Sequence, residues 1–288
     1  MFRFLTFMIV LFSIIHADLP QALQWCNSNV SFWSEARYDG DYRLFAFRKN
    51  DAFEEAYFCE TNQNIDVAFF AVKKKFYWMF RSEIRGGLGD SQYGMVLHPY
   101  DISYGLINTF EYRFKHFHLA SGLDHRCFHY IDQRPPEPIV YWNKFIITLN
   151  SPHRRDVPAV KKYVSDESWN SIDRLMWSFG WGYYITNFFN SVNTVKLMSV
   201  DRPHYLHDFQ LSGKIGLWRW NSGALAVTSA TLLGYKTSGK AYWAQESGME
   251  LMIGVNNNDI SLFIDYVVDG GRFNSKDRLL EYGVRLTR

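Results

Sequence analysis

Hydrophobic and polar residues alternate with a period of two along much of the second half of the chain. Between Tyr205 and Leu217, the odd positions are mostly apolar and the even positions polar or small: Tyr205, His207, Phe209, Leu211, Gly213, Ile215 and Leu217 alternate with Asp208, Gln210, Ser212, Lys214 and Gly216. Successive side chains of a strand point to opposite faces, so this pattern predicts a β-strand with one apolar and one polar face. The same alternation recurs between Leu280 and Thr287.

Turn signals separate these alternating segments. Clusters rich in Gly, Asn, Ser and Asp occur at 220–223, 236–239, 256–259 and 269–271. Strands of about ten residues joined by tight turns are typical of a transmembrane β-barrel, and the spacing predicts an all-β, antiparallel barrel of roughly twelve strands, between about ten and fourteen. The alternative is a soluble periplasmic β-sandwich, which would bury Trp177, Phe179 and Trp181 in a core.

Similar patterns occur in the first half of the chain. They predict a possible first strand at 42–47, a hairpin over 65–85, and strands over 101–118, 139–149 and 173–185. The last of these has the strongest lipid-facing stripe, made of Leu175, Trp177, Phe179, Trp181, Tyr183 and Ile185. Residues 51–59 are predicted to be partly helical, 86–93 to form a Gly-rich loop, and 150–170 a long extracellular loop.

Charged side chains alternate with apolar ones in two of these strands. Their positions predict that they face a polar lumen and pair with opposite charges across neighbouring strands. The residues are Arg81, Glu83, Glu111, Arg113 and Lys115.

Composition agrees with a barrel. Aromatic residues make up 18% of the 288 residues and charged residues 21%, with a mean hydropathy of −0.23. A barrel accounts for both features, because its lumen is polar and its rims carry aromatic girdles. The net charge of +2 gives no strong field for nucleic acid.

The N-terminus has the features of a secretory signal peptide over residues 1–17. Arg3 provides the positive start, Leu5–Ile15 an apolar core too short to span a bilayer, and Ala17 a cleavage site. Residues 18–64 are expected to lead into the barrel and residues 65–288 to form it. These features predict the outer membrane of a Gram-negative bacterium, with outer-membrane lipids, lipopolysaccharide and the barrel-assembly machinery as partners and no nucleic acid.

The densest group of reactive side chains lies between His116 and His125. A His, a Ser and an acid are the parts of a hydrolase in which His takes the proton of the Ser hydroxyl. The candidate catalytic residues are His118 as base, Ser121 as nucleophile and Asp124 as the group that orients the His. Because three residues separate His118 from Ser121, they share a face only if a β-bulge intervenes.

This segment resembles two groups of barrels. Outer-membrane phospholipases and lipid A deacylases place a His, and a Ser two residues on, on the outer face of a strand, which implies an acyl-ester hydrolase. Residues 110–114 and 118–124 also resemble an uncharacterised family of bacterial outer-membrane proteins with a His-x-Ser-Ser-His-x-Gly-Asp type strand end, which implies an outer-membrane barrel of unknown activity.

Other chemistry has weaker support. A metal site could draw on His116, His118, Asp124, His125 and His129. Cys26 could pair with Cys59 in an oxidising compartment. The three Cys residues do not have the spacing of metal ligands. No cofactor-binding motif occurs. The sequence therefore predicts a barrel with a structural or surface-interaction role, or alternatively a lipid acyl-ester hydrolase.

Overall fold

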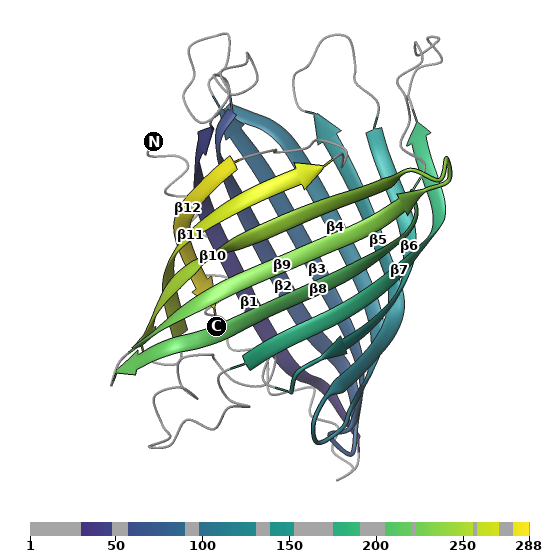
Figure 1. Ribbon diagram of the computed structural model, residues 1–288. Coiled ribbons are helices and arrows are strands. Elements are labelled where there is room, and N and C mark those ends of the chain that lie inside the picture. Colours follow the sequence, from purple (N-terminus) through teal and green to yellow (C-terminus); the bar gives the residue numbers. More distant parts are fainter. Residues whose placement is uncertain are drawn as a thin grey trace.

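The chain forms a single closed β-barrel (Figure 1). The computed structural model describes residues 30–47, 57–89, 98–130, 139–152, 175–190, 205–220, 223–255, 258–270 and 279–287. Twelve strands lie in these ranges: β1 (Val30–Phe47), β2 (Tyr57–Val72), β3 (Phe76–Gly89), β4 (His98–Arg113), β5 (His118–Tyr130), β6 (Ile139–Asn150), β7 (Leu175–Asn190), β8 (Tyr205–Trp220), β9 (Gly223–Lys236), β10 (Ala241–Val255), β11 (Asn258–Gly270) and β12 (Leu279–Thr287).

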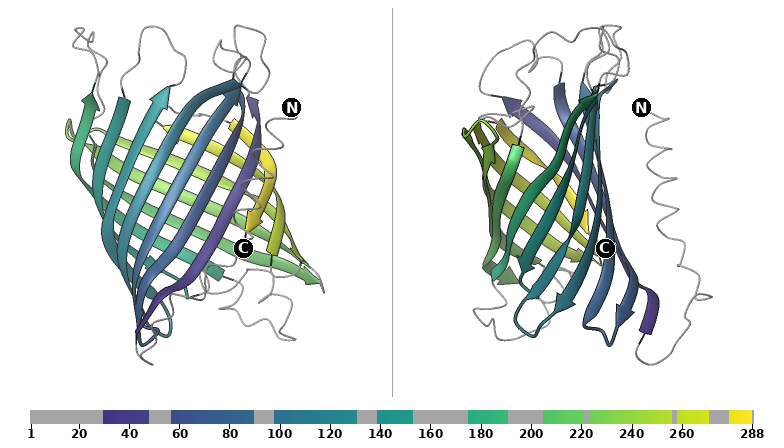
Figure 2. Two further views of the ribbon diagram at one scale, coloured as in Figure 1. Left: turned by 180° about the vertical axis from the view of Figure 1, so that it is seen from behind. Right: turned by 90° about the vertical axis from the view of Figure 1, so that its right-hand side faces the viewer.

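Each strand pairs antiparallel with its neighbours in sequence, and β1 closes the barrel against β12. At this closure Tyr42 lies opposite Val284, and Leu44 lies opposite Tyr282. Closure leaves no unpaired sheet edge, which is the condition for a sheet to cross a bilayer. Figure 2 shows the tilted strands from two further sides. The predicted fold class and strand number are confirmed.

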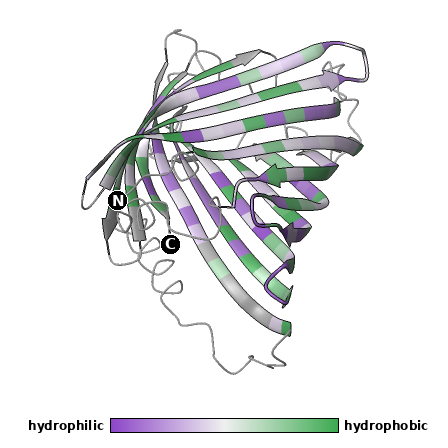
Figure 3. Ribbon diagram, turned by 60° about the horizontal axis from the view of Figure 1, so that its bottom comes forward, coloured by the Kyte–Doolittle hydropathy of each residue, from purple (hydrophilic) through white to green (hydrophobic). Residues whose placement is uncertain are grey.

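The outer surface of the barrel is apolar. On β7, Leu175, Phe179 and Tyr183 are 41%, 41% and 45% exposed, and Trp177 and Trp181 lie on the same face, partly exposed. On β8, Leu211 and Ile215 are also exposed. Figure 3 shows hydrophilic and hydrophobic residues alternating along the strands. The β-sandwich alternative is therefore wrong, because the predicted apolar stripe faces outward.

Aromatic side chains mark both ends of this apolar surface. We call the end with the turns at 73–75 and 114–117 the turn end, and the opposite end the loop end. Exposed Tyr112 and Phe114 lie at the turn end, and exposed Tyr104 lies in the half of β4 that is toward the loop end. Such girdles sit at the membrane–water interfaces of transmembrane barrels, whose short turns face the periplasm.

Several predicted boundaries differ from the structure. The barrel begins at Val30, before residue 65, and Cys59 lies in β2 rather than in a helix. Residues 86–89 continue β3 rather than starting a loop. Residues 1–29 and 51–56 lie outside the described part of the chain, so the signal peptide stays a prediction.

The predicted extracellular loop at 150–170 connects strands on the other side of the barrel. Asn150 ends β6 and Leu175 begins β7, and both lie at the turn end because consecutive strands run in opposite directions. The reason is β5, which lies between the predicted strands at 101–118 and 139–149, because each additional strand moves the later connections to the opposite side of the barrel.

Tyr205 and Lys115 also differ from their predicted positions. A register shift between Tyr205 and His207 turns Tyr205 into the lumen, where it is buried, although the alternation put it on the apolar face. Lys115 lies in the exposed turn between β4 and β5 rather than in the lumen. Within the described ranges, no helix is long and apolar enough to cross a membrane.

Candidate functional site

The lumen is filled by ion pairs between strands. Arg81 on β3 makes two hydrogen bonds to Asp66 on β2, with Nε 2.5 Å from Oδ1 and Nη2 2.7 Å from Oδ2. Arg113 on β4 donates to Glu111 at 2.8 Å and lies over the ring of Tyr77. The predicted inward orientation of Arg81, Glu83, Glu111 and Arg113 is thus what the structure has.

Some of these pairs cross over an intervening strand at an inward-facing glycine. Arg126 on β5 is 2.7 Å from Glu83 on β3, and Gly105 of β4 lies between them in the same row. A Cβ atom at Gly105 would lie 3.3 Å from Glu83 Oε2 and 3.7 Å from Arg126 Cζ. Because Gly105 has no side chain, there is space above β4 for the Arg126–Glu83 ion pair to form.

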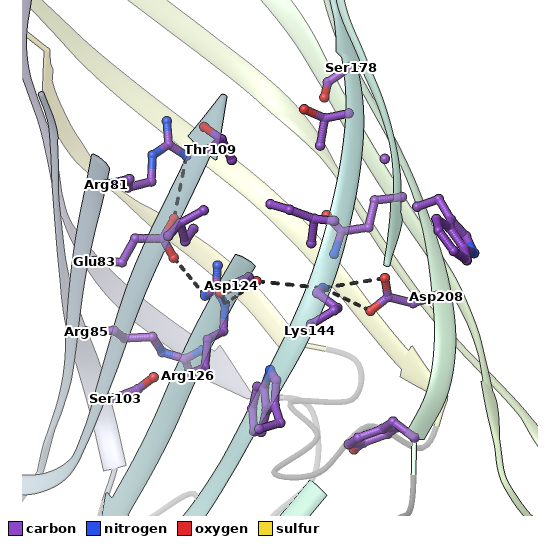
Figure 4. A pocket seen from close by; sticks show the side chains of 18 of the residues that line it. Arg81, Glu83, Arg85, Ser103, Thr109, Asp124, Arg126, Lys144, Ser178 and Asp208 are labelled. Atoms are coloured by element: carbon purple, nitrogen blue, oxygen red, sulfur yellow. Dashed lines mark hydrogen bonds and ion pairs between the residues drawn. The ribbon is translucent and has the colours of Figure 1, made fainter. Parts of the chain in front are cut away.

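A cavity of about 540 Å³ remains in the lumen. Its wall includes Arg81, Arg126 and Lys144 together with the acids Glu83, Asp124 and Asp208 (Figure 4). Toward the loop end, the rings of Tyr184, Tyr205 and Tyr242 pack at centroid distances of 5.0–5.2 Å. Charged pairs and aromatic rings therefore line the interior, into which the side chains of a small barrel point.

The three predicted catalytic residues do not come together. His118 is 3% exposed and Asp124 4% exposed on the lumen side, whereas Ser121 shares the outer face with the exposed Leu119 and Leu123. Strand β5 pairs with β4 and β6 without a register shift, so the required bulge is absent. His118 and Asp124 are also about 20 Å apart along the strand, at about 3.3 Å per residue. The geometry that the His118–Ser121 hypothesis requires is therefore missing.

The alternative metal site also lacks the necessary arrangement, and the Cys26–Cys59 disulfide stays a prediction. His116 lies in the exposed turn, while Asp124 and His125 point to opposite faces of β5. Among the described residues, no group of three or more His, Cys, Asp or Glu side chains is placed to hold a metal ion. Cys59 is a buried free thiol with Sγ 3.8 Å from the carbonyl oxygen of Leu88, and Cys26 lies outside the described residues.

A different group of reactive side chains lies on the outer face of β5 and β6. His125 and Asn143 are opposite each other in the antiparallel pair, with His125 Nδ1 2.8 Å from Asn143 Oδ1. When the amide oxygen accepts this hydrogen bond, Nδ1 carries the proton and Nε2 is left as the basic nitrogen. The pair thus holds an imidazole in one tautomer and one orientation.

Cys127 lies two residues after His125 and shares its face of the strand. Its thiol is free and partly exposed. Positions i and i+2 are nearest neighbours on one face of a strand, about 6.6 Å apart along the chain. Nucleophile, base and orienting amide are the three components of a Cys–His–Asn catalytic group.

Tyrosines locate this group with respect to the bilayer. In the register, Cys127 lies between Tyr104 on β4 and Tyr141 on β6. Tyr104 belongs to the aromatic residues toward the loop end and is 37% exposed. Tyrosines are enriched at membrane–water interfaces, where the ester groups of lipids lie.

A β-bulge adjoins the group. The register between β6 and β7 shifts between Asn143 and Lys144, which pair with Thr186 and Tyr184, so the extra residue of the bulge is Ile185 of β7. Bulges often occur next to active sites. On the two sides of this shift, Asn143 faces outward to His125 and Lys144 faces inward to the cavity.

The sequence contained a partial signal for this group. The odd parity of Leu119, Leu123, His125 and Cys127 assigns all four to one face once the strand is recognised. Ser121 has the same parity but lies four residues from His125. Asn143 could not be found from spacing, because strand register brings it to His125.

Comparisons with known proteins find similarity in the fold alone. No protein-family model and no curated protein matches the chain. A dimer of the Salmonella typhi outer membrane phospholipase with bound calcium is 13% identical, covering 92% of this chain and 94% of that chain with a TM-score of 0.50. An active-site mutant of outer membrane phospholipase A from Escherichia coli is 12% identical, covering 94% and 93% with a TM-score of 0.51.

A porin, KdgM, is 10% identical and covers 87% of this chain and 97% of its own, with a TM-score of 0.45. At these identities the phospholipases share the barrel architecture with this chain. The fold and the apolar outer surface are those of an integral β-barrel of the bacterial outer-membrane type.

Proposed function

We propose that the protein is an outer-membrane acyl-ester hydrolase in which Cys127 is the nucleophile, His125 the general base and Asn143 the residue that orients the base. The observation that carries this proposal is the 2.8 Å hydrogen bond between His125 and Asn143 on the lipid-facing side of the barrel. The substrate class is a carboxylic ester of a membrane lipid at the loop end, in keeping with the phospholipases that share this fold.

The chemistry follows from the arrangement of the three side chains. Nε2 of His125 takes the proton of the Cys127 thiol, and the thiolate attacks the carbonyl carbon of the ester. The carbon–oxygen bond to the leaving alcohol breaks, and the imidazolium returns the proton to that oxygen. Water then attacks the thioester, His125 accepts a proton from it, and the released thiolate recovers that proton.

The position of the group suits this reaction. The interface supplies both the ester groups of lipids and the water that the second step consumes. The hydrogen bond to Asn143 keeps the proton on Nδ1, so that Nε2 is free to act as base throughout. An interior site in this barrel would reach neither the lipid esters nor the acyl chains.

The test is ester cleavage by the folded barrel in mixed micelles of detergent and phospholipid. Replacement of the nucleophile in Cys127→Ala should abolish the reaction, and His125→Ala should lower it on the order of a thousandfold or more. Ser121 lies on the same face of β5 as Cys127, and His118 lies on the lumen face. The Ser121→Ala and His118→Ala variants are therefore matched controls that should keep activity. Activity that survives in Cys127→Ala, or is lost in Ser121→Ala, would refute the assignment.

A structural or surface-interaction role is the second candidate. The ion pairs that fill the lumen favour it, since they stabilise the barrel without any chemistry. This role predicts that the protein has no ester cleavage, and that Cys127→Ala has no effect on the lipid composition of the envelope.

A further inference from the structure

Lys144 is the centre of a buried charge cluster in the lumen. Its side chain is 7% exposed, and its Nζ atom lies 3.2 Å from Asp208 Oδ2 and 3.8 Å from Asp124 Oδ2. Tyr184 donates a further hydrogen bond of 2.7 Å to Asp208. A buried ammonium group is stable only when it is paired and hydrogen-bonded, so these contacts fix the end of the Lys144 side chain. Figure 4 shows Asp124 and Asp208 on the two sides of Lys144.

The cluster connects three strands across a glycine. Asp124 is on β5, Lys144 on β6 and Asp208 on β8. A Cβ atom at Gly182 of β7 would collide with Lys144 Cδ and lie 2.8 Å from Asp208 Oδ1. The bare backbone of β7 therefore lets Lys144 reach over it to Asp208.

This cluster lies directly behind His125, Cys127 and Asn143, which we call the outer-face group. In the β5–β6 register, Asp124 is opposite Lys144, and the next row pairs His125 with Asn143. Adjacent residues of a strand point to opposite faces. The Asp124–Lys144 ion pair is therefore on the lumen side of the sheet, and the His125–Asn143 hydrogen bond in the next row is on the lipid side. The β6–β7 register shift falls between Asn143 and Lys144.

We propose that Lys144 is a positioning residue for the outer-face group: its ion pairs with Asp124 and Asp208 hold β6 in place beside the bulge at Ile185 of β7, so that Asn143 stays opposite His125. The lumen thereby controls the geometry of a site that faces lipid. The expected effect of Lys144 on catalysis rests on the proposed function. Its effect on the His125–Asn143 hydrogen bond does not.

The test reads that hydrogen bond directly. Nitrogen NMR of ¹⁵N-histidine-labelled protein in micelles reports which ring nitrogen of His125 carries the proton, with the signal assigned through His125→Gln. In the unmodified protein the proton is expected on Nδ1, held by Asn143. In Lys144→Met the signal should shift toward the Nε2–H form, which predominates in a free imidazole.

Two further variants complete the experiment. Lys214→Met removes another lumenal lysine, whose Nζ is 2.5 Å from Glu250 on β10, and should leave the His125 signal unchanged. Asp208→Asn weakens the cluster while keeping the shape of the side chain, and provides the measurement if Lys144→Met does not fold. Heat-modifiable migration on gels confirms that each variant is folded.

Ester cleavage supplies the second readout. In folded Lys144→Met or Asp208→Asn, kcat should fall about tenfold or more with KM nearly unchanged, because a mispositioned base affects the chemical step. An unchanged His125 signal in these variants would overturn the positioning role. Failure of the proposed function is distinguishable, since it leaves the Nδ1–H signal and its dependence on Lys144 intact in a protein without ester cleavage.

Discussion

The imidazole of His125 and the side-chain amide of Asn143 meet on the lipid-facing surface of the barrel, with Nδ1 2.8 Å from Oδ1. Both residues are on strands that otherwise present Leu123, Phe145 and Ile147 to the membrane. A polar pair within an apolar surface is costly unless its groups bond to each other, and it usually marks a functional site. The first prediction concerns this pair.

Asn143→Leu should lower kcat/KM for ester cleavage by roughly two orders of magnitude or more, because the imidazole loses the group that fixes its tautomer. Asn143→Asp should retain more activity, since a carboxylate oxygen also accepts the Nδ1 proton. The measurement is initial rates with a chromogenic ester in micelles. Equal rates for the two variants would show that hydrogen-bond acceptance at this position is unimportant.

Trp181→Arg should destabilise the barrel by about 2–4 kcal/mol, the usual cost of a cation that faces the middle of the membrane. Trp181 lies opposite Ile147 and Phe209, both on the outer face. The free energy of unfolding in micelles, from urea titration, gives the value. Gln210→Arg, which adds the same charge to the lumen side of β8, is the control and should cost less. An unchanged midpoint for Trp181→Arg would contradict the membrane-facing orientation.

The protein should show little conductance in planar bilayers, because ion pairs such as Arg126–Glu83 and Lys144–Asp208 cross the lumen. Double replacement in Arg81→Ala/Arg126→Ala removes two guanidinium groups from the cavity wall and should raise conductance. Large, stable currents from the unmodified barrel would show that the lumen is open.

Glycines of the lumen should differ in their tolerance of a methyl group. A Cβ atom at Gly283 would collide with the backbone carbonyl oxygen of Tyr42, across the β1–β12 closure. Gly283→Ala should therefore destabilise the barrel by about 1–3 kcal/mol. At Gly105 the contacts are 3.3 Å or more, and to side chains, so Gly105→Ala should cost less by the same urea titration. The reverse order would disprove this explanation of closure.

Period-two alternation was sufficient to predict the barrel, because half of each strand must be apolar for lipid and half polar for the lumen. It succeeded on β12, where no bulge interrupts the stripe, and on β7, where the bulge falls only at the last residue of the predicted stripe, Ile185. It failed at Tyr205, where a register shift reverses the faces. A bulge depends on pairing with a neighbouring strand, which the alternation of a single segment does not record.

The candidate site was harder to predict than the fold. His125 and Cys127 lie within or just after the His-rich segment 116–125, and their shared face follows only when residues 118–130 are recognised as a strand. Asn143 comes from the next strand, 18 residues away, and only the register joins it to His125. Charge alternation predicted that the charged residues of β3 and β4 face the lumen, but not the bridges that cross a third strand.

The most direct test of the central claim is to trap the acyl-enzyme. The folded protein is incubated with an activated short-chain ester, quenched in acid, digested and analysed by mass spectrometry. We expect an acyl group bound to Cys127 as a thioester, released by neutral hydroxylamine and absent from the Cys127→Ala protein. Ester cleavage without an adduct on Cys127, or with an adduct on another residue whose replacement abolishes activity, would contradict the central claim.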